Sequence, residues 1–312
     1  MTLLHLDAVG TQPKMADGTD VATAFAALPS GSSTIIVLLH GFRYAPTAPH
    51  NSPHSTLYSL TPNSRLARAN VSWVGGLGIE AEATNGNLCI GFGWNARGTI
   101  WRANAQAQSA AIALRTTLRL LRARFAHRPI AILAHSLGAR VALESLEGLS
   151  ADTVARMVLM SPAVMQQHAQ TALKTPAGRS TEVINIISRQ NDLYDAALEW
   201  MLHPRDVQAK ALGDGLGHAQ NNWLDIEIDH PQVSRALMQI GHPLGPAPAT
   251  VCHWSCYTRD GIFDLYKAML CKPRETPLPY LRRHLGQPAT PRWSRLINPD
   301  LRRMLLPFAL KS

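Results

Sequence analysis

The segment Ile130–Arg140, IAILAHSLGAR, constrains the fold more than any other part of this sequence. A run of apolar residues typical of a buried strand ends at His135 and Ser136, and the helical pattern ARVALESLEGL begins three residues after the serine. A strand that turns at once into a helix brings two backbones close together, so the residues two before and two after the turn must be small. Ala134 and Gly138 meet this requirement. The pattern therefore predicts a strained turn that presents Ser136 outward as a nucleophile.

Four other short apolar runs bounded by turn residues predict further strands that are buried on both faces. They are residues 33–39, 88–94, 154–160 and 183–188. Helical patterns separate several of these runs, and the longest, residues 104–126, carries leucines at spacings of three and four. Strands that alternate with helices predict an α/β fold with a mainly parallel sheet flanked by helices.

A second motif lies upstream, where the strand in IIVLLHGFRY ends at His40 and Gly41. With this motif and the elbow A-H-S-L-G, the chain resembles the α/β-hydrolase superfamily of serine hydrolases. The resemblance implies that His40 and Gly41 support a loop whose backbone N–H at Phe42 forms half of an oxyanion hole. The N–H of Leu137, directly after the nucleophile, would form the other half.

A serine hydroxyl is a poor nucleophile at neutral pH, so a histidine must accept its proton and an acid must orient that histidine. The superfamily order of nucleophile, acid, histidine places the acid after the strand at 183–188. Asp192 is the favoured acid, because it follows that strand by four residues and precedes a helical pattern. Asp195 is the alternative acid, and a helix N-cap is the alternative role for Asp192.

The histidine is expected on a loop after the last strand. His253 follows the short extended run PATVC and is the favoured base, with His242 and His218 as alternatives. Cys252 and Cys256 flank His253, but a structural zinc site needs four ligands and no second pair lies nearby. We therefore expect no metal and no organic cofactor.

Two further residues are candidates for the lining of the substrate pocket: Arg43, after the predicted oxyanion loop, and Trp94, at the end of a strand. For Trp94, packing in the core is the favoured alternative. Residues 43–70 and 196–250 are longer than ordinary connections and are expected to be insertions that shape a binding site.

The net charge of +9 is concentrated at the C-terminus, where residues 272–312 hold nine Lys and Arg against two Asp and Glu. We expect a hydrolase domain over residues 1–271 and a basic extension over 272–312 that packs on the domain or projects from it. Weak association with a membrane surface is possible for this mixture of arginine and apolar residues, whereas no nucleic-acid motif accompanies the charge. The sequence does not indicate an oligomeric state.

The N-terminus lacks the pattern of a signal peptide, no apolar run approaches about 20 residues, and four cysteines are too few for a disulfide scaffold. A cytoplasmic location is therefore expected. The predicted function is a serine hydrolase that cleaves a small carboxylic ester through an acyl-enzyme on Ser136. Acyl transfer, or cleavage of a thioester or amide, uses the same triad, and a non-catalytic protein that binds a ligand or a membrane surface is the remaining alternative.

Overall fold

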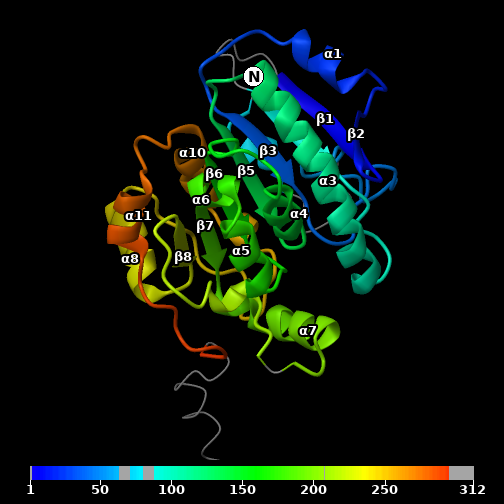
Figure 1. Ribbon diagram of the computed structural model, residues 1–312. Coiled ribbons are helices and arrows are strands. Elements are labelled where there is room, and N and C mark those ends of the chain that lie inside the picture. The colour runs from blue at the N-terminus through cyan, green and yellow to red at the C-terminus, as the bar shows by residue number, and fades with distance from the viewer. Residues whose placement is uncertain (1, 63–70, 80–87, 207, 295–312) are drawn as a thin grey trace, which may run out of the picture.

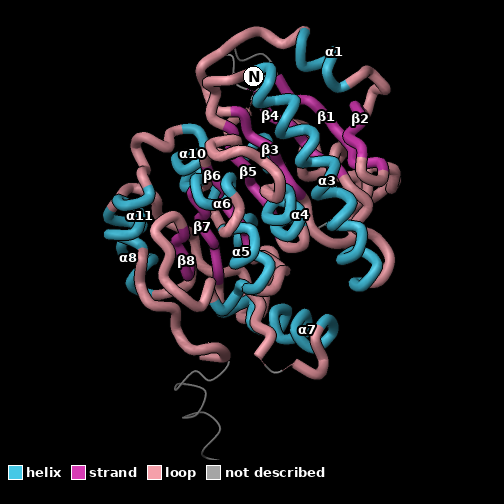
Figure 2. Tube along the Cα trace, viewed as in Figure 1, coloured by secondary structure: helices cyan, strands magenta, loops and turns pink. Residues whose placement is uncertain are grey.

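The computed structural model describes residues 2–62, 71–79, 88–206 and 208–294. Within these residues the chain forms a sheet in the order β2-β1-β4-β3-β5-β6-β7-β8, with helices on both faces (Figures 1 and 2). All neighbouring strands are parallel except β1 and β2, which form an antiparallel hairpin at one edge. The strands are β1 (Thr2–Val9), β2 (Gln12–Met15), β3 (Ile35–Leu39), β4 (Leu88–Gly93), β5 (Ile130–His135), β6 (Arg156–Met160), β7 (Glu182–Ile187) and β8 (Trp223–Glu227).

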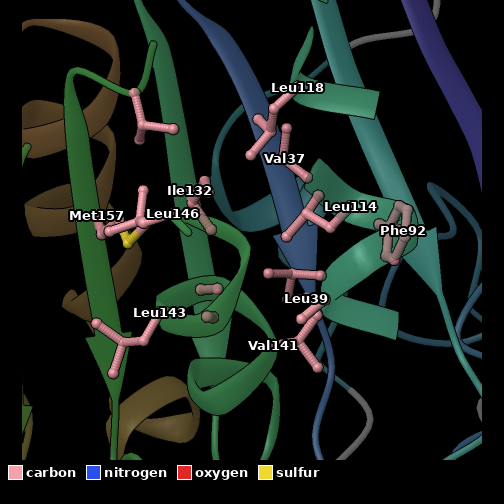
Figure 3. Close-up of a cluster of buried hydrophobic side chains, with 14 of the residues drawn as sticks. Val37, Leu39, Phe92, Leu114, Leu118, Ile132, Val141, Leu143, Leu146 and Met157 are labelled. Carbon is pink, nitrogen blue, oxygen red and sulfur yellow. The ribbon is translucent and has the colours of Figure 1, made fainter. Parts of the chain in front are cut away.

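Side chains alternate along each central strand, and they divide the core into one cluster on each face of the sheet. On the first face, strand residues such as Val37 and Ile132 pack against α3 and α4 (Figure 3). The helices that contribute to this cluster are α1 (Val21–Ala26), α3 (Ile100–Arg124), α4 (Gly138–Ser145), α5 (Gln166–Leu173) and α6 (Pro176–Ser180).

The opposite face buries the alternate strand residues, including Ile36 and Leu38 of β3. The helices that contribute to this second cluster are α2 (Trp73–Gly76), α8 (Pro231–Gln239), α9 (Ser255–Thr258), α10 (Ile262–Cys271) and α11 (Leu278–Leu285). The remaining elements are the short 3-10 helices η1 (Arg189–Asn191) and η2 (Leu212–Asp214), and α7 (Asp192–Leu202). None of the described helices is both long enough and apolar enough to cross a membrane.

The α/β-hydrolase fold and its mainly parallel sheet are confirmed, and the five predicted strands correspond to β3 through β7. Three strands were not predicted because their sequences are not continuous apolar runs. β1 and β2 form a partly exposed hairpin with polar residues, of which β2 is the edge strand, and β8, WLDIE, is short and carries two acidic residues. Residues 196–250, expected to be an insertion, contain β8 and α8 and therefore complete the sheet and one of its layers.

The first part of the C-terminal extension packs on the domain. α11 buries Leu278, Leu281 and Leu285 in the second core cluster, and the Thr290 hydroxyl donates to Glu227 Oε1 of β8 over 2.6 Å. Residues 272–294 therefore continue the fold. The rest of the predicted extension, residues 295–312, and residues 63–70 of the first expected insertion lie outside the described residues.

Candidate active site

The turn from β5 into α4 holds Ser136 in a strained backbone conformation. Its φ angle is +54°, in the left-handed region that costs a non-glycine residue about 1–3 kcal/mol. The Ser136 N–H donates to Met160 O of β6 over 3.1 Å, which fixes the turn to the neighbouring strand. The serine thus lies at the carboxyl end of β5 near the middle of the sheet, where the superfamily places its nucleophile.

The residues around the turn leave almost no space between the two backbones. A Cβ atom on Gly138 would lie 2.5 Å from His40 O and 2.6 Å from Leu39 O. A Cβ atom on Gly41 would lie 2.6 Å from Ser136 Cβ, so the loop after β3 lies directly against the serine. Ala134, the small residue two positions before Ser136, is fully buried between β3 and β6. This is the close approach that the sequence predicts at an elbow.

His40 fixes the orientation of the loop after β3. The Trp94 backbone N–H donates to His40 Nε2 over 3.1 Å, so the ring proton is on Nδ1, which lies 2.9 Å from Gly41 O and donates to it. Burial lowers the pKa of His40 to about 3, so the ring stays neutral. Because C=O and N–H point in opposite directions across a trans peptide, this bond turns the Phe42 N–H away from His40. In the described part of the chain, neither this N–H nor that of Leu137 donates to a protein acceptor.

Trp94 belongs to the support of this loop and not to the lining of a pocket. Its indole is fully buried and stacks on His40 at 5.5 Å between ring centroids, and its Nε1 donates to His40 O over 3.1 Å. The suggestion that Trp94 lines a pocket is therefore wrong, and its alternative as a core residue is confirmed. Arg43 is exposed, with its guanidinium carbon 5.9 Å from the centroid of the Phe42 ring.

His253 lies beside the elbow on the loop that precedes α9. Its imidazole lies 4.7 Å, centroid to centroid, from that of His135, the residue before the serine. His135 Nε2 lies 3.4 Å from His253 O, and Tyr194 of α7 stacks on the His253 ring at 4.9 Å. Burial lowers the pKa of His253 to about 4, so its imidazole is neutral at pH 7. Within the described residues, no hydrogen bond joins Ser136 Oγ to His253, and such bonds often tighten only when substrate binds.

The residue that holds His253 is an asparagine. Asn191 Oδ1 lies 2.6 Å from His253 Nδ1, so the ring carries its proton on Nδ1 and leaves the Nε2 lone pair available. The amide in turn donates from Nδ2 to Asp195 Oδ1 over 2.9 Å. An ionised Asp195 only accepts hydrogen bonds, so in that form this contact fixes which end of the Asn191 amide faces the histidine. Burial raises the pKa of Asp195 to about 7.

The predicted pairing of Asp192 with His253 is wrong. Asp192 Oδ2 accepts the backbone N–H of Trp293 over 2.7 Å, and Oδ1 lies 3.2 Å from Nη1 of Arg189. Burial is the largest influence on its carboxyl group and raises its pKa. The physical reason is that the 3-10 turn η1 continues directly into α7, so adjacent side chains point in different directions. The sequence signal that was missed is Asn191 itself, because an amide oxygen accepts a bond from imidazole as a carboxylate does.

The alternative histidines lie elsewhere. His242 follows the end of α8, where its N–H donates to Leu237 O, and exposed His218 lies 3.4 Å from the amide nitrogen of Gln220. In the described residues, no His, Cys, Asp and Glu group has the geometry to hold a metal ion, and Cys252 and Cys256 are free thiols.

Comparisons with known proteins place these features in a family. The sequence profile described as "Alpha/beta hydrolase of unknown function (DUF900)" matches residues 26–199, which include the elbow, Asn191 and most of α7. No curated protein matches. Among solved structures, a protein from Lactobacillus plantarum WCFS1 called a cell surface hydrolase is 14% identical, with 68% of this chain and 92% of that chain covered and a TM-score of 0.37.

Prolyl oligopeptidase B from Galerina marginata is 11% identical, with 57% of this chain and 26% of that chain covered and a TM-score of 0.27. Neither likeness bears on what this chain does, because both TM-scores are low. The profile match extends over more than half of the chain and contains the strand-turn-helix at Ser136. The chain belongs to this family of α/β hydrolases, whose function is not known.

Proposed function

We propose that this chain is a serine hydrolase that cleaves carboxylic esters through an acyl-enzyme on Ser136. The observation that carries the proposal is the position of His253. Its ring lies beside the residue before the serine, and its Nδ1 is bonded to Asn191 Oδ1 at 2.6 Å. A histidine held in this tautomer, next to a serine at an elbow, is equipped to act as a general base.

In the proposed reaction, His253 Nε2 accepts the hydroxyl proton as Ser136 Oγ attacks the acyl carbon. The tetrahedral oxyanion forms against the N–H groups of Phe42 and Leu137, both of which lack an acceptor within the described residues. The imidazolium then gives its proton to the departing alkoxide as the C–O bond breaks. A water molecule repeats the sequence on the acyl-enzyme, releases the carboxylic acid and restores the Ser136 hydroxyl.

The neutral amide at Asn191 favours esters over amides as substrates. Asn191 orients His253, but it stabilises the imidazolium less than a carboxylate in direct contact would. Asp195, one residue further along this relay, can contribute negative charge only from behind the amide and only when it is ionised. An amide needs strong protonation of its leaving nitrogen, whereas an alkoxide, or the thiolate of a thioester, departs more readily. A thioester is therefore the second substrate class, and acyl transfer to an alcohol would use the same groups.

The test is labelling of the purified protein by a fluorophosphonate, with the modified residue located by peptide mass spectrometry. We expect the label on Ser136 and its loss in Ser136→Ala and in His253→Ala. Ser161 offers a matched control, because it also follows a strand with a positive φ angle, +42°, and is buried. Ser161→Ala should label as the wild type does.

Labelling that persists in His253→Ala would show that His253 is not the general base. A folded protein that does not label would contradict the enzyme proposal and leave a non-catalytic binding protein as the explanation of the site. Once labelling is established, hydrolysis of matched p-nitrophenyl esters, thioesters and anilides would rank the substrate classes.

A further inference from the structure

The helix α7 exposes large apolar side chains in addition to those that it buries. Asp192, Asp195 and Leu198 are buried against the protein, whereas Leu193 is 53% exposed, Tyr194 37% and Trp200 73%. Leu193 and Trp200 are seven residues apart, so they lie on the same side of the helix, and Tyr194 lies next to that side. A surface helix normally turns its apolar side inward, so this arrangement leaves apolar area exposed to water.

Two tryptophans from other parts of the chain extend the apolar surface. Trp101, at the start of α3, is 57% exposed, and its Nε1 donates to Met201 O of α7 over 2.8 Å. Trp254 is 40% exposed, and its ring centroid lies 6.2 Å from that of Tyr194. Figure 1 shows α7 at the margin of the molecule, beside the N-terminal end of α3.

We call these five residues the α7 surface: Trp101, Leu193, Tyr194, Trp200 and Trp254. They include every tryptophan that is exposed among the described residues. Tyr194 and Trp254 also border the candidate active site, because Tyr194 stacks on His253 and Trp254 is the next residue in the chain. The α7 surface is therefore continuous with the site.

Cations flank this surface. Arg97 and Arg102 are exposed on either side of Trp101 in the sequence, and exposed Arg205 follows the end of α7 by three residues. None of the three forms an ion pair with a carboxylate in the described part of the chain. The acidic residues of α7 itself are engaged inside the protein, and Glu199 is bound by Arg292 over 2.9 Å.

We propose that the α7 surface docks on an anionic phospholipid bilayer. Tryptophan and tyrosine favour the boundary between lipid head groups and acyl chains, because each has an apolar ring and a polar atom. The three exposed arginines beside them are attracted to anionic head groups. Docking in this orientation would place the border of the candidate site against the lipid. Docking in this position would favour a substrate whose acyl group comes from a lipid; this part of the inference rests on the proposed function, but the docking itself does not.

The test is flotation of the full-length protein with vesicles of phosphatidylcholine and phosphatidylglycerol in a 7:3 ratio, compared with phosphatidylcholine alone. We expect binding to the mixed vesicles that weakens at high salt, and weaker binding to the neutral vesicles. Trp200→Glu and Leu193→Glu should each weaken binding by about tenfold or more, because an apolar side chain that enters the lipid is replaced by an anion.

Met238→Glu is the matched control, because Met238 is 68% exposed on α8, outside the α7 surface. It should bind as the wild type does. Ser136→Ala should also bind normally, so failure of docking and failure of the proposed reaction can be told apart.

Any one of three results would overturn the proposal: the wild type does not float with the mixed vesicles, Met238→Glu weakens binding as much as Trp200→Glu does, or the wild type binds neutral and mixed vesicles equally well. If the wild type does not float but forms a dimer, and Trp200→Glu dissociates that dimer, the α7 surface would instead bind a second copy of this chain.

Discussion

The candidate site has two sides that are built by different means. On the β3–β5 side, backbone atoms set the geometry: Gly138 touches the carbonyl groups at the end of β3, and Gly41 lies against Ser136. On the β7–α7 side, side chains set it: Asn191 spans the distance between His253 and Asp195. The first side has no room for an added atom. The geometry of the second side depends on which polar atom of Asn191 faces His253 and which faces Asp195.

This difference determines how each side fails. A larger side chain on the backbone side cannot be accommodated, because the atoms that it would contact belong to the main chain at the end of a central strand. A change in the relay of His253, Asn191 and Asp195 leaves the fold intact but alters a proton position or a charge. Variants of the backbone side should therefore lose stability, and variants of the relay should lose reactivity.

Gly138→Ala should produce the largest effect. The new methyl group would lie 2.5 Å from His40 O, and we expect a loss of about 3 kcal/mol in the free energy of unfolding, together with loss of labelling at Ser136. Urea unfolding followed by circular dichroism measures the change. Gly75→Ala, whose nearest neighbour would be the side-chain Ser72 Oγ at 3.1 Å, is the control and should change stability much less. A Gly138→Ala protein of normal stability would show that the two backbones are not in contact.

Asn191 belongs to the relay and the adjacent Asp192 does not, so substitutions at these two positions should give opposite results. Asn191→Ala removes the partner of His253 and should slow fluorophosphonate labelling by about 10- to 100-fold, with little loss of stability. Asp192→Ala leaves the Trp293 N–H without its acceptor and removes the nearest of three carboxylates around Arg189, so it should cost about 1–3 kcal/mol of stability and leave labelling nearly unchanged. Labelling rates and urea midpoints of the two variants test this. The reverse pattern would return Asp192 to the role that the sequence suggested.

Exchanging the residues at positions 191 and 195 should build a carboxylate–histidine pair. Asn191→Asp alone would set two carboxyl groups face to face across the present 2.9 Å contact, so one of them would have to hold a proton. In the double variant Asn191→Asp/Asp195→Asn, the new amide can donate to the new carboxylate. We expect the pKa of His253 to rise by about 1–2 units in the double variant, measured from the pH dependence of labelling. An unchanged pKa in the double variant would mean that position 191 does not contact the histidine.

The pH dependence of the wild type should be the smallest effect. Because burial lowers the pKa of His253 to about 4, its imidazole stays neutral well below pH 6.5. The labelling rate should therefore stay constant over that range and fall with a midpoint of about pH 4. A labelling rate that instead falls with a midpoint near pH 6.5 would indicate that the His253 imidazole is solvated.

Asp195 should make its own contribution to the pH dependence of stability. Its pKa is raised to about 7, so the stability associated with its neutral form is fully present below about pH 4 and is lost as the pH rises through about 7. Asp195→Asn should remove this part of the decline in urea midpoint between those values. An identical profile in the variant would show that Asp195 does not titrate there.

The same division explains what could be predicted from the sequence. The elbow at Ser136 was predictable because a strand-turn-helix restricts residue size within five consecutive positions. The central strands were predictable because both of their faces are apolar, whereas β1 and β8 expose or pair polar side chains.

The partner of His253 could not be predicted, because it depends on where α7 begins. A difference of one residue in that start decides whether Asn191 or Asp192 faces the loop at 253, and both are polar and both follow β7. The exposed apolar side of α7 could not be predicted for a related reason. Its sequence, DLYDAALEWML, reads as amphipathic, but the pattern does not say which side faces the protein.

The contact between Asp192 and the Trp293 backbone has a consequence for how the protein is made. The anchor at residue 293 leaves the ribosome 157 residues after Ser136, an interval of about 8–30 s at usual rates of synthesis. During that time the elbow can fold on β3, β4 and β5, but the turn that carries Asn191 lacks one of its attachments. A nascent chain would thus present its serine well before the histidine relay is secured, and reactivity would arise only after residue 293 has been made.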